Sequence, residues 1–155
     1  YTTQQRMAGW SDALEPAGVT PIVVNAQDST EAAGYAAAGF FLSLPADRRP
    51  TAVLAYSDRI ALGAVQAARD LGMEVPIDLS VVGFDDAAFA ATSRPPLTTV
   101  RQDVSRKGRE ATALLRDAIE RRVAQRPDHR LLPTELVVRA STAPARKSTR
   151  RVTAR

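Results

Sequence analysis

The stretch AVLAYSDRIALGAVQAARDLGMEVPIDLSVVGFDD, residues 52–86, decides the fold. It opens and closes with short apolar runs, 52–56 and 79–84, which are typical of buried β-strands. Between the runs, apolar residues follow helical spacing as far as Leu71, and Gly72 stands where a helix usually ends. Strand, helix and strand of this length make a βαβ unit with two parallel strands. The stretch therefore predicts a parallel sheet with flanking helices, an α/β fold.

Residues upstream continue the alternation of helix and strand. Met7, Trp10 and Leu14 have the spacing of one helical face. The β-branched run 21–25 predicts another buried strand, and the alanine-rich segment 30–44 predicts a second helix. Strand starts near 21, 52 and 79 lie about one βαβ unit apart, so we expect three parallel strands from these segments.

Downstream of this stretch the pattern changes. Residues 85–94 show little periodicity, and the prolines at the start of 95–100 keep that segment extended. A long helix follows, and its apolar seam comprises Val104, Gly108, Ala111, Leu115 and Ala118. A polar connector over 121–130 contains His129, and 131–138 predicts a final strand.

Composition narrows the class of protein. Of the 155 residues, 45% are hydrophobic and 25% charged, as in an average globular protein. No stretch approaches the about 18 consecutive apolar residues of a membrane helix, so we expect no membrane contact. With no cysteine and one histidine, the chain has no disulfide framework, thiol nucleophile or cysteine and histidine zinc site.

The net charge of +4 comes from one end of the chain. Residues 140–155 hold five of the 21 basic residues and no acid, which leaves 16 basic against 17 acidic residues elsewhere. We expect this segment to be a disordered, solubilising tail; a phosphate-binding arm is the less favoured alternative. The chain also begins at Tyr1, directly in a helical pattern, and we expect it to be the later part of a longer protein.

Polar side chains follow each predicted strand. Asn25 follows the first, Ser57 and Asp58 the second, and Asp85 and Asp86 the third. The carboxyl ends of parallel strands share one edge, where loops diverge and ligands bind. Amide, hydroxyl and carboxylate groups there favour a neutral ligand rich in hydroxyls, such as a sugar. The alternative is that each residue only caps a helix or forms a turn.

Catalytic chemistry is poorly supported. His129 lies in the polar connector, far from the strand ends, and no Gly-x-Ser-x-Gly elbow is present. No glycine-rich phosphate loop follows a strand. Asp85 and Asp86 are adjacent and lack an obvious third ligand, which disfavours a metal site or an acid and base pair. We expect no enzyme, no cofactor and no metal.

Several blocks together resemble the effector domain of LacI/GalR-type bacterial transcription regulators. The blocks are RMAGW (6–10), SDRIALGA (57–64), VPIDLSVVGFDD (75–86), PPLTTVRQ (95–102) and LLPTELVVR (131–139). The resemblance covers nearly all of residues 1–142 in the family's order. It implies a periplasmic-binding-protein-like fold of type I, truncated at its N-terminus and built of two lobes with a small effector between them.

The resemblance implies roles for single residues. Arg6 matches the family's ligand-contacting arginine, and Asp85 the acid that accepts hydrogen bonds from ligand hydroxyls. Ser57 stands where several members carry asparagine, which shortens that contact, and Asp58 is either a ligand contact or a helix cap. Gln102 matches a polar residue at the crossover between the lobes.

Aromatic residues leave two alternatives open. Tyr35 offers a face for a sugar ring, but both Tyr35 and Trp10 are more often core residues. The small apolar segment 87–91 around Phe89 resembles part of the family's dimer interface.

The resemblance also divides the chain. Residues 1–101 and 130–139 are assigned to the C-terminal lobe, and 102–129 to a crossover and a helix of the N-terminal lobe. The seam of the long helix then faces a sheet that this sequence does not include. The implied protein is a cytoplasmic, homodimeric repressor. It senses a small molecule, which we expect to be a sugar, and binds operator DNA through an N-terminal helix-turn-helix domain. A periplasmic sugar-binding protein of a transport system is the alternative.

Overall fold

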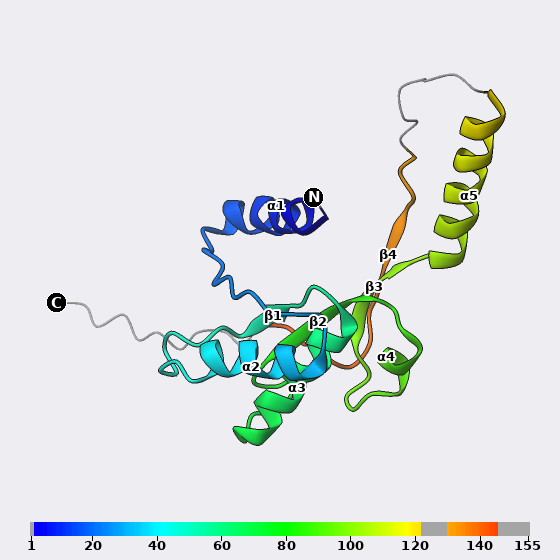
Figure 1. Cartoon of the computed structure of the whole chain (residues 1–155). Coiled ribbons are helices and arrows are strands. Elements are labelled where there is room, and N and C mark those ends of the chain that lie inside the picture. The colour runs from blue at the N-terminus through cyan, green and yellow to red at the C-terminus, as the bar shows by residue number, and fades with distance from the viewer. Residues whose placement is uncertain (1, 122–129, 146–155) are drawn as a thin grey trace.

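The described residues form one mixed sheet with helices around it (Figure 1). The structure, a computed structural model, describes residues 2–121 and 130–145. In chain order the elements are α1 (Thr2–Leu14), η1 (Glu15–Ala17), α2 (Glu31–Leu42), β1 (Ala52–Leu54), α3 (Asp58–Asp70), β2 (Ser80–Asp85), α4 (Ala88–Thr92), β3 (Thr98–Gln102), α5 (Val104–Arg121) and β4 (Thr134–Val137).

The sheet order is β1-β2-β3-β4. Strands β1, β2 and β3 are parallel, with Val53 opposite Val81 and Phe84 opposite Val100. Strand β4 pairs antiparallel with β3, because the chain returns after α5 and places Thr134 opposite Gln102. The βαβ unit predicted over 52–86 is confirmed, and the fold is of the α/β class.

The predicted strand over 21–25 is wrong. This segment is outside the four strands, and Ile22 and Val23 are 49% and 55% exposed, while Val24 packs against the core. A β-branched run favours an extended backbone, but a strand also needs a neighbouring strand to hydrogen-bond with. The local sequence pattern does not show whether such a partner exists. The third parallel strand is β3, which the prolines before it led us to expect only as an extended segment.

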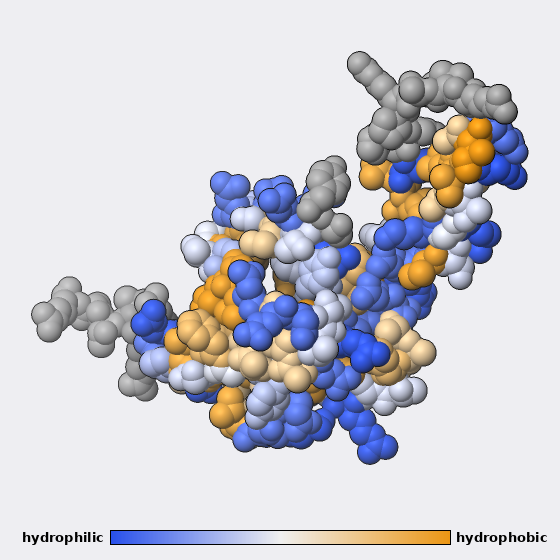
Figure 2. All heavy atoms as spheres, viewed as in Figure 1, coloured by the Kyte–Doolittle hydropathy of each residue, from blue (hydrophilic) through white to orange (hydrophobic). Residues whose placement is uncertain are grey.

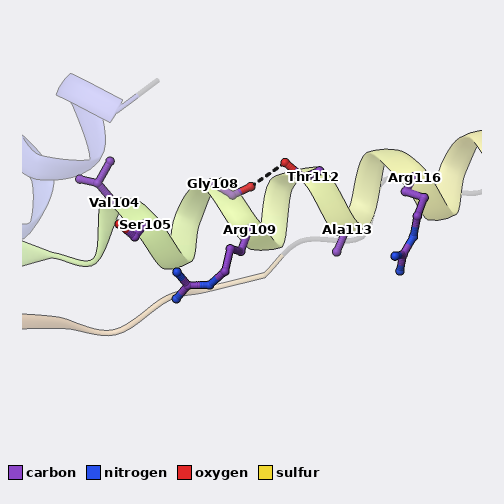
Figure 3. A pocket seen from close by; sticks show the side chains of 7 residues that line it. All are labelled: Val104, Ser105, Gly108, Arg109, Thr112, Ala113 and Arg116. Atoms are coloured by element: carbon purple, nitrogen blue, oxygen red, sulfur yellow. Dashed lines mark hydrogen bonds between the residues drawn. The ribbon is translucent and has the colours of Figure 1, made fainter.

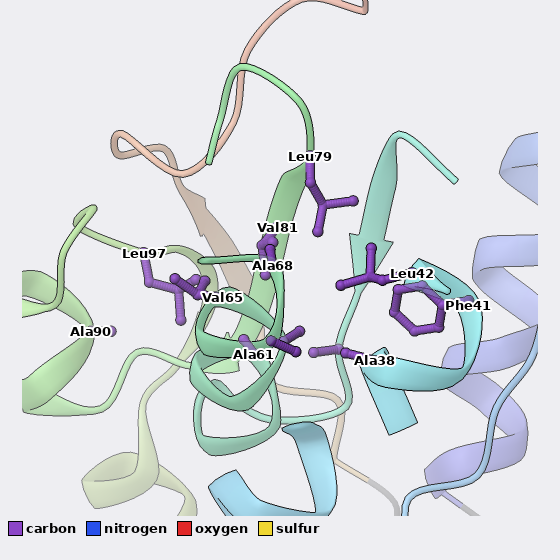
Figure 4. Packing of buried hydrophobic residues seen from close by; sticks show 13 residues of the cluster. Ala38, Phe41, Leu42, Ala61, Val65, Ala68, Leu79, Val81, Ala90 and Leu97 are labelled. Carbon is purple, nitrogen blue, oxygen red and sulfur yellow. The ribbon is translucent and has the colours of Figure 1, made fainter. Parts of the chain in front are cut away.

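The core lies between the sheet and the pair α2 and α3. Thr30 and Ser57 cap these helices, each accepting a hydrogen bond from the backbone N–H three residues on. Figure 4 shows side chains of both helices meeting those of β2 and its neighbours. The largest fully buried apolar side chains are Leu42, Leu79, Leu97 and Val81.

Two glycines let α2 and α3 approach closely. A Cβ at Gly34 would lie 2.7 Å from Ile60 Cα, and one at Gly63 would lie 2.5 Å from Tyr35 N and overlap the Glu31 carbonyl. Backbone atoms form these contacts and have no rotamer by which to move aside. Close packing of this helix pair therefore depends on the absence of two side chains.

Ser141, at the start of the predicted disordered segment 140–155, has a defined place in the fold. Ser141, expected in the disordered segment 140–155, is fully buried: its Oγ donates to Val81 O (2.6 Å) and accepts from Thr98 N (2.8 Å). Val81 N donates in turn to Ser141 O, so residue 141 is held to β2 by hydrogen bonds in both directions. Residues 146–155, with all five basic side chains, and 122–129, with His129, lie outside the described residues.

Helix α5 and the segment before β4 form an arm that projects from the sheet, and the chain returns to the sheet as β4 (Figure 1). The predicted seam of α5 is exposed: Val104 and Leu115 are 63% and 62% accessible, and Ile119, next to seam residue Ala118, is 67% accessible. Figure 2 shows hydrophobic residues on this arm. None of the helices in the described part of the chain has the length and apolar character that crossing a membrane requires.

Replacing Gly63 with alanine should force α2 and α3 apart and lower the free energy of unfolding by about 3 kcal/mol. The matched control is Gly39→Ala on α2, where an added Cβ meets nothing within 4 Å. That change should leave stability unaltered or raise it by about 1 kcal/mol, because alanine favours helix. Urea unfolding followed by circular dichroism measures both; equal effects of the two variants would contradict the close-approach argument.

The exposed α5 seam should cause this 155-residue chain to form large, ill-defined assemblies. Leu115→Lys combined with Ile119→Lys should suppress them, whereas Ile77→Lys, at an exposed apolar loop residue, should not. Sedimentation velocity over a range of concentrations distinguishes these outcomes. A wild-type chain that stays free of large assemblies at all concentrations would show that the seam is harmless.

Candidate functional site

Arg6 joins α1 to the carboxyl edge of the sheet. Its guanidinium carbon lies 3.6 Å from the centroid of the Phe84 ring and 4.3 Å from that of Tyr56. Its Nη1 donates to Tyr56 O at 2.7 Å. Tyr56 directly precedes Ser57, and Phe84 directly precedes Asp85, so Arg6 lies beside the ends of both β1 and β2. Stacking on two rings fixes the plane of the guanidinium group.

Asp85 and Gln102 meet at the ends of β2 and β3. Gln102 Nε2 donates to Asp85 Oδ1 at 2.6 Å, and both side chains are half-buried. Among the hydrogen bonds of the described residues, Asp85 Oδ2 takes part in none, which leaves a carboxylate acceptor at this edge. The backbone of Asp85 has a φ of 112°, a conformation that L-residues rarely adopt.

Ser57 and Asp58 lie at the same edge but serve the fold. Ser57 is 8% exposed and its Oγ accepts from Ile60 N at 3.4 Å, as a helix cap. Asp58 is 1% exposed, and its two carboxylate oxygens accept from Thr99 Oγ1 (2.6 Å) and Ala87 N (2.7 Å). The structure favours the structural role of Asp58 over a ligand contact, because the side chain is buried and each carboxylate oxygen already accepts a hydrogen bond from the protein. Desolvation raises the pKa of Asp58, against the lowering effect of these two hydrogen bonds.

Asp86 connects the edge to two arginines. Its Oδ2 lies 2.6 Å from Arg101 Nε, and its Oδ1 lies 2.6 Å from Arg139 Nη2. Burial raises the pKa of Asp86, but the hydrogen bonds and charges of Arg139 and Arg101 outweigh it, so that the pKa falls below its ordinary value. Asp86 is thus an ion-pair partner that ties the turn after β2 to β3 and to the segment after β4.

Tyr35 lies elsewhere. It is on α2, and the nearby Asp70 carboxylate raises the pKa of Tyr35. Asp70 is the last residue of α3, whereas the carboxyl edge of the sheet meets the first turn of that helix. The structure therefore does not group Tyr35, predicted to offer a face to a sugar ring, with the other candidate residues at the carboxyl edge. The sequence placed Tyr35 on a helix but gave no information about the direction of its side chain.

The edge groups three candidate ligand contacts: Arg6, Asp85 and Gln102. Together they present a fixed cationic donor, a carboxylate acceptor and an amide, the set that binds several hydroxyls of one small molecule. Sequence reasoning overlooked Tyr56 and Phe84, which hold Arg6. A signal was present, because each is an aromatic residue directly before a polar pair at a strand end.

Other features of the described residues do not add chemistry to this edge. Residues 2–121 and 130–145 contain no group of three histidine, cysteine or acidic side chains suited to a metal ion. A groove of about 570 Å³ runs along one face of α5, from Val104 to Arg116 (Figure 3). Its lining comprises Val104, Ser105, Gly108, Arg109, Thr112, Ala113 and Arg116.

Comparison with known proteins identifies relatives over most of the chain. A family model described as a periplasmic binding protein-like domain matches residues 1–142. The HTH-type transcriptional regulator DegA of Bacillus subtilis is 40% identical over 146 residues, 91% of this chain and 41% of DegA. The HTH-type transcriptional repressor CytR of Escherichia coli is 40% identical over 139 residues, 88% of this chain and 40% of CytR. The chain thus spans about two fifths of the length of these curated relatives.

Solved structures of transcription regulators are also similar to this chain. A LacI-family regulatory protein from Chloroflexus aggregans is 35% identical, with a TM-score of 0.75 over 89% of this chain and 50% of its own. The lac repressor dimer bound to operator and the anti-inducer ONPF is 32% identical, with a TM-score of 0.79 over 90% of this chain and 47% of its own. The complex of the transcriptional regulator CelR with cellobiose is 38% identical, with a TM-score of 0.77 over 88% and 41%.

Asp86→Asn should lower the free energy of unfolding at pH 7 by about 2 kcal/mol, because it weakens two charge-assisted hydrogen bonds. The folded-state pKa of Asp86 lies below that of the unfolded chain, so this stabilisation is present above about pH 4 and is lost as the pH falls through the lowered pKa. Unfolding measured from pH 7 to pH 3 should therefore show the variant and the wild type converging in acid. Asp47→Asn, in an exposed loop, is the control; curves that stay parallel would contradict the ion-pair role.

Proposed function

Because the chain belongs to the periplasmic binding protein-like family and, within it, to the LacI-type transcription regulators, we propose that it forms the effector-binding part of a repressor that senses a sugar. The observation that carries the proposal is the grouping of Arg6, Asp85 and Gln102 at the carboxyl edge of the sheet. The CelR complex, with its cellobiose, supports a sugar as the effector class.

In this proposal the three side chains divide the work of recognition. Asp85 Oδ2 accepts hydrogen bonds from sugar hydroxyls, and the Gln102 amide holds Asp85 Oδ1 at 2.6 Å and so orients the carboxylate. Arg6 donates from a guanidinium group whose plane Phe84 and Tyr56 fix. Ser57, with a shorter side chain than asparagine, leaves more room beside the ligand. The sugar is bound and released without a chemical step, so the proposed role is not enzymatic.

The proposed sensor has two lobes. Residues 1–101 and 130–139 belong to the C-terminal lobe, and 102–129 cross to the N-terminal lobe, whose sheet covers the α5 seam. The exposure of that seam and the return of β4 beside β3 support this division. A sugar that binds one arrangement of the lobes more tightly shifts the equilibrium toward it, by no more than the difference in affinity.

The lobes act on DNA through a dimer. In the proposal, a homodimer forms in part through α4, where Phe89 lies under the Arg59 guanidinium at 5.6 Å. Operator DNA is bound by a helix-turn-helix domain outside this sequence, and the protein acts in the cytoplasm. The names of DegA and CytR as HTH-type regulators favour this role over a periplasmic binding protein for transport.

A thermal-shift panel on the complete protein tests the effector class. Ribose, sucrose and cellobiose represent sugars, and free nucleobases represent the competing class. A sugar present at about 100 times its Kd should stabilise the protein by about 2.7 kcal/mol, which raises the melting temperature by several degrees. If only nucleobases raise the melting temperature, the effector is a nucleobase and not a sugar. A secretion signal in the complete gene would favour the transport role.

Asp85→Ala should weaken binding of the sugar that gives the largest shift by roughly a hundredfold, because a carboxylate bonded to hydroxyls contributes about 2–3 kcal/mol. Asp85→Asn, which tolerates a positive φ, should retain the melting temperature and still lose most of the affinity. Calorimetric titration of both variants, with Asp47→Ala as the control, makes the comparison. Wild-type affinity in either Asp85 variant would remove Asp85 from the site.

A further inference from the structure

The turn that carries Asp85 has an unfavourable backbone. Asp85 and the next residue, Asp86, have φ values of 112° and 55°. Two successive positive φ angles at residues with side chains cost free energy and persist only where neighbouring groups impose them. The acid that we propose to bind the effector is therefore presented by a turn that must be held from outside.

Two buried side chains hold this turn by its backbone. Asp58 Oδ2 accepts from Ala87 N at 2.7 Å, and Thr99 Oγ1 accepts from Asp86 N at 3.4 Å. Thr99 Oγ1 also donates to Asp58 Oδ1 at 2.6 Å, which links the two groups. The first two residues after Asp85 are thus each bound through their amide N–H to one connected pair of side chains.

The fold makes room for this arrangement. A Cβ at Gly83 would overlap Asp58 Oδ1, so the glycine two residues before Asp85 leaves the space that the carboxylate fills. Asp58 is 1% exposed and Thr99 is fully buried. Burial raises the pKa of Asp58, which means that keeping this carboxylate in the interior costs free energy. A buried acid that is 1% exposed and forms two short hydrogen bonds has a structural role at this turn.

We propose that Asp58, through the Ala87 amide and together with Thr99, is a positioning residue that holds the Asp85 turn in the conformation that binds the effector. Asp58 itself touches no ligand. The inference rests on the proposed function, because Asp85 is taken to be the ligand-binding acid. Its distinguishing consequence is that removing the Asp58 oxygens loosens one turn and weakens binding, beyond any general loss of stability.

The test uses three variants of the complete protein. Asp58→Ala removes both acceptors. Asp58→Asn keeps one oxygen, which must face Ala87 N–H since that group only donates, while the Thr99 hydroxyl can turn to accept from the new amide. Thr99→Val removes the hydroxyl at nearly constant volume and serves if Asp58→Ala does not fold. Asp78→Ala is the matched control, because Asp78 Oδ2 also accepts a backbone N–H, that of Glu74 at 2.8 Å, but near the amino end of β2.

Two measurements are made on each variant. Hydrogen–deuterium exchange is followed in peptides that cover residues 84–89, with no ligand present. Calorimetry then gives the Kd for whichever of ribose, sucrose and cellobiose binds the wild type most tightly. Asp58→Ala and Thr99→Val should each speed exchange of 84–89 and weaken binding by at least tenfold. Asp58→Asn should restore both quantities to within about threefold of the wild type.

The outcomes separate the inference from the proposed function. Unchanged exchange of 84–89 in Asp58→Ala and Thr99→Val, or wild-type affinity in either, overturns the positioning role. So does an equal loss of affinity in Asp78→Ala at a matched melting temperature, since that would indicate a general effect of stability. If none of the sugars binds the wild type, the proposed function fails; faster exchange confined to 84–89 would then still establish what holds the turn.

Discussion

The carboxylate of Asp58 occupies the position that a side chain at residue 83 would need, and this close approach of α3 to β2 governs the geometry of the strand ends. From that position Asp58 reaches β3 through Thr99 and the start of α4 through Ala87. One side chain thus links α3, β3 and the turn after β2. The turn has a backbone that its own residues disfavour, so its shape depends on these links.

Three neighbouring aspartates acquire different properties from their surroundings. Asp58 is buried and hydrogen-bonded on both oxygens, and Asp86 is neutralised by Arg101 and Arg139. Their pKa values move in opposite directions, since desolvation dominates for Asp58 and the arginines dominate for Asp86. Asp85 alone is half-buried with one carboxylate oxygen outside the hydrogen bonds of the described residues. Of these three acids, Asp85 is the one that combines partial exposure with a carboxylate oxygen outside those hydrogen bonds, as ligand binding requires.

The sequence predicted what depends on local pattern and missed what depends on distant partners. The helices over Glu31–Leu42 and Asp58–Asp70 were predicted to within two residues, because their caps and apolar spacing are local signals. The segment 21–25 has strand composition but no place in the sheet, since its pairing is decided by residues far along the chain. In the site, strand ends placed Ser57, Asp58 and Asp85 at one edge, but only the structure showed that two of them are occupied by the protein.

The position of Gln102 suits it to couple ligand binding to the arrangement of the lobes in the proposed sensor. It ends β3, touches Asp85, and is separated from the first residue of α5 by Asp103 alone. Asp103 Oδ1 accepts from Arg106 N at 2.8 Å, so the direction in which α5 leaves the sheet is fixed within one turn of Gln102. In a two-lobed sensor, a ligand distinguishes the lobe arrangements only through contacts that differ between them. In the proposed division of the chain, Arg6 and Asp85 belong to the C-terminal lobe, and Gln102 ends β3 where the chain crosses to the N-terminal lobe. We therefore expect closure of the lobes to act on the ligand site through Gln102.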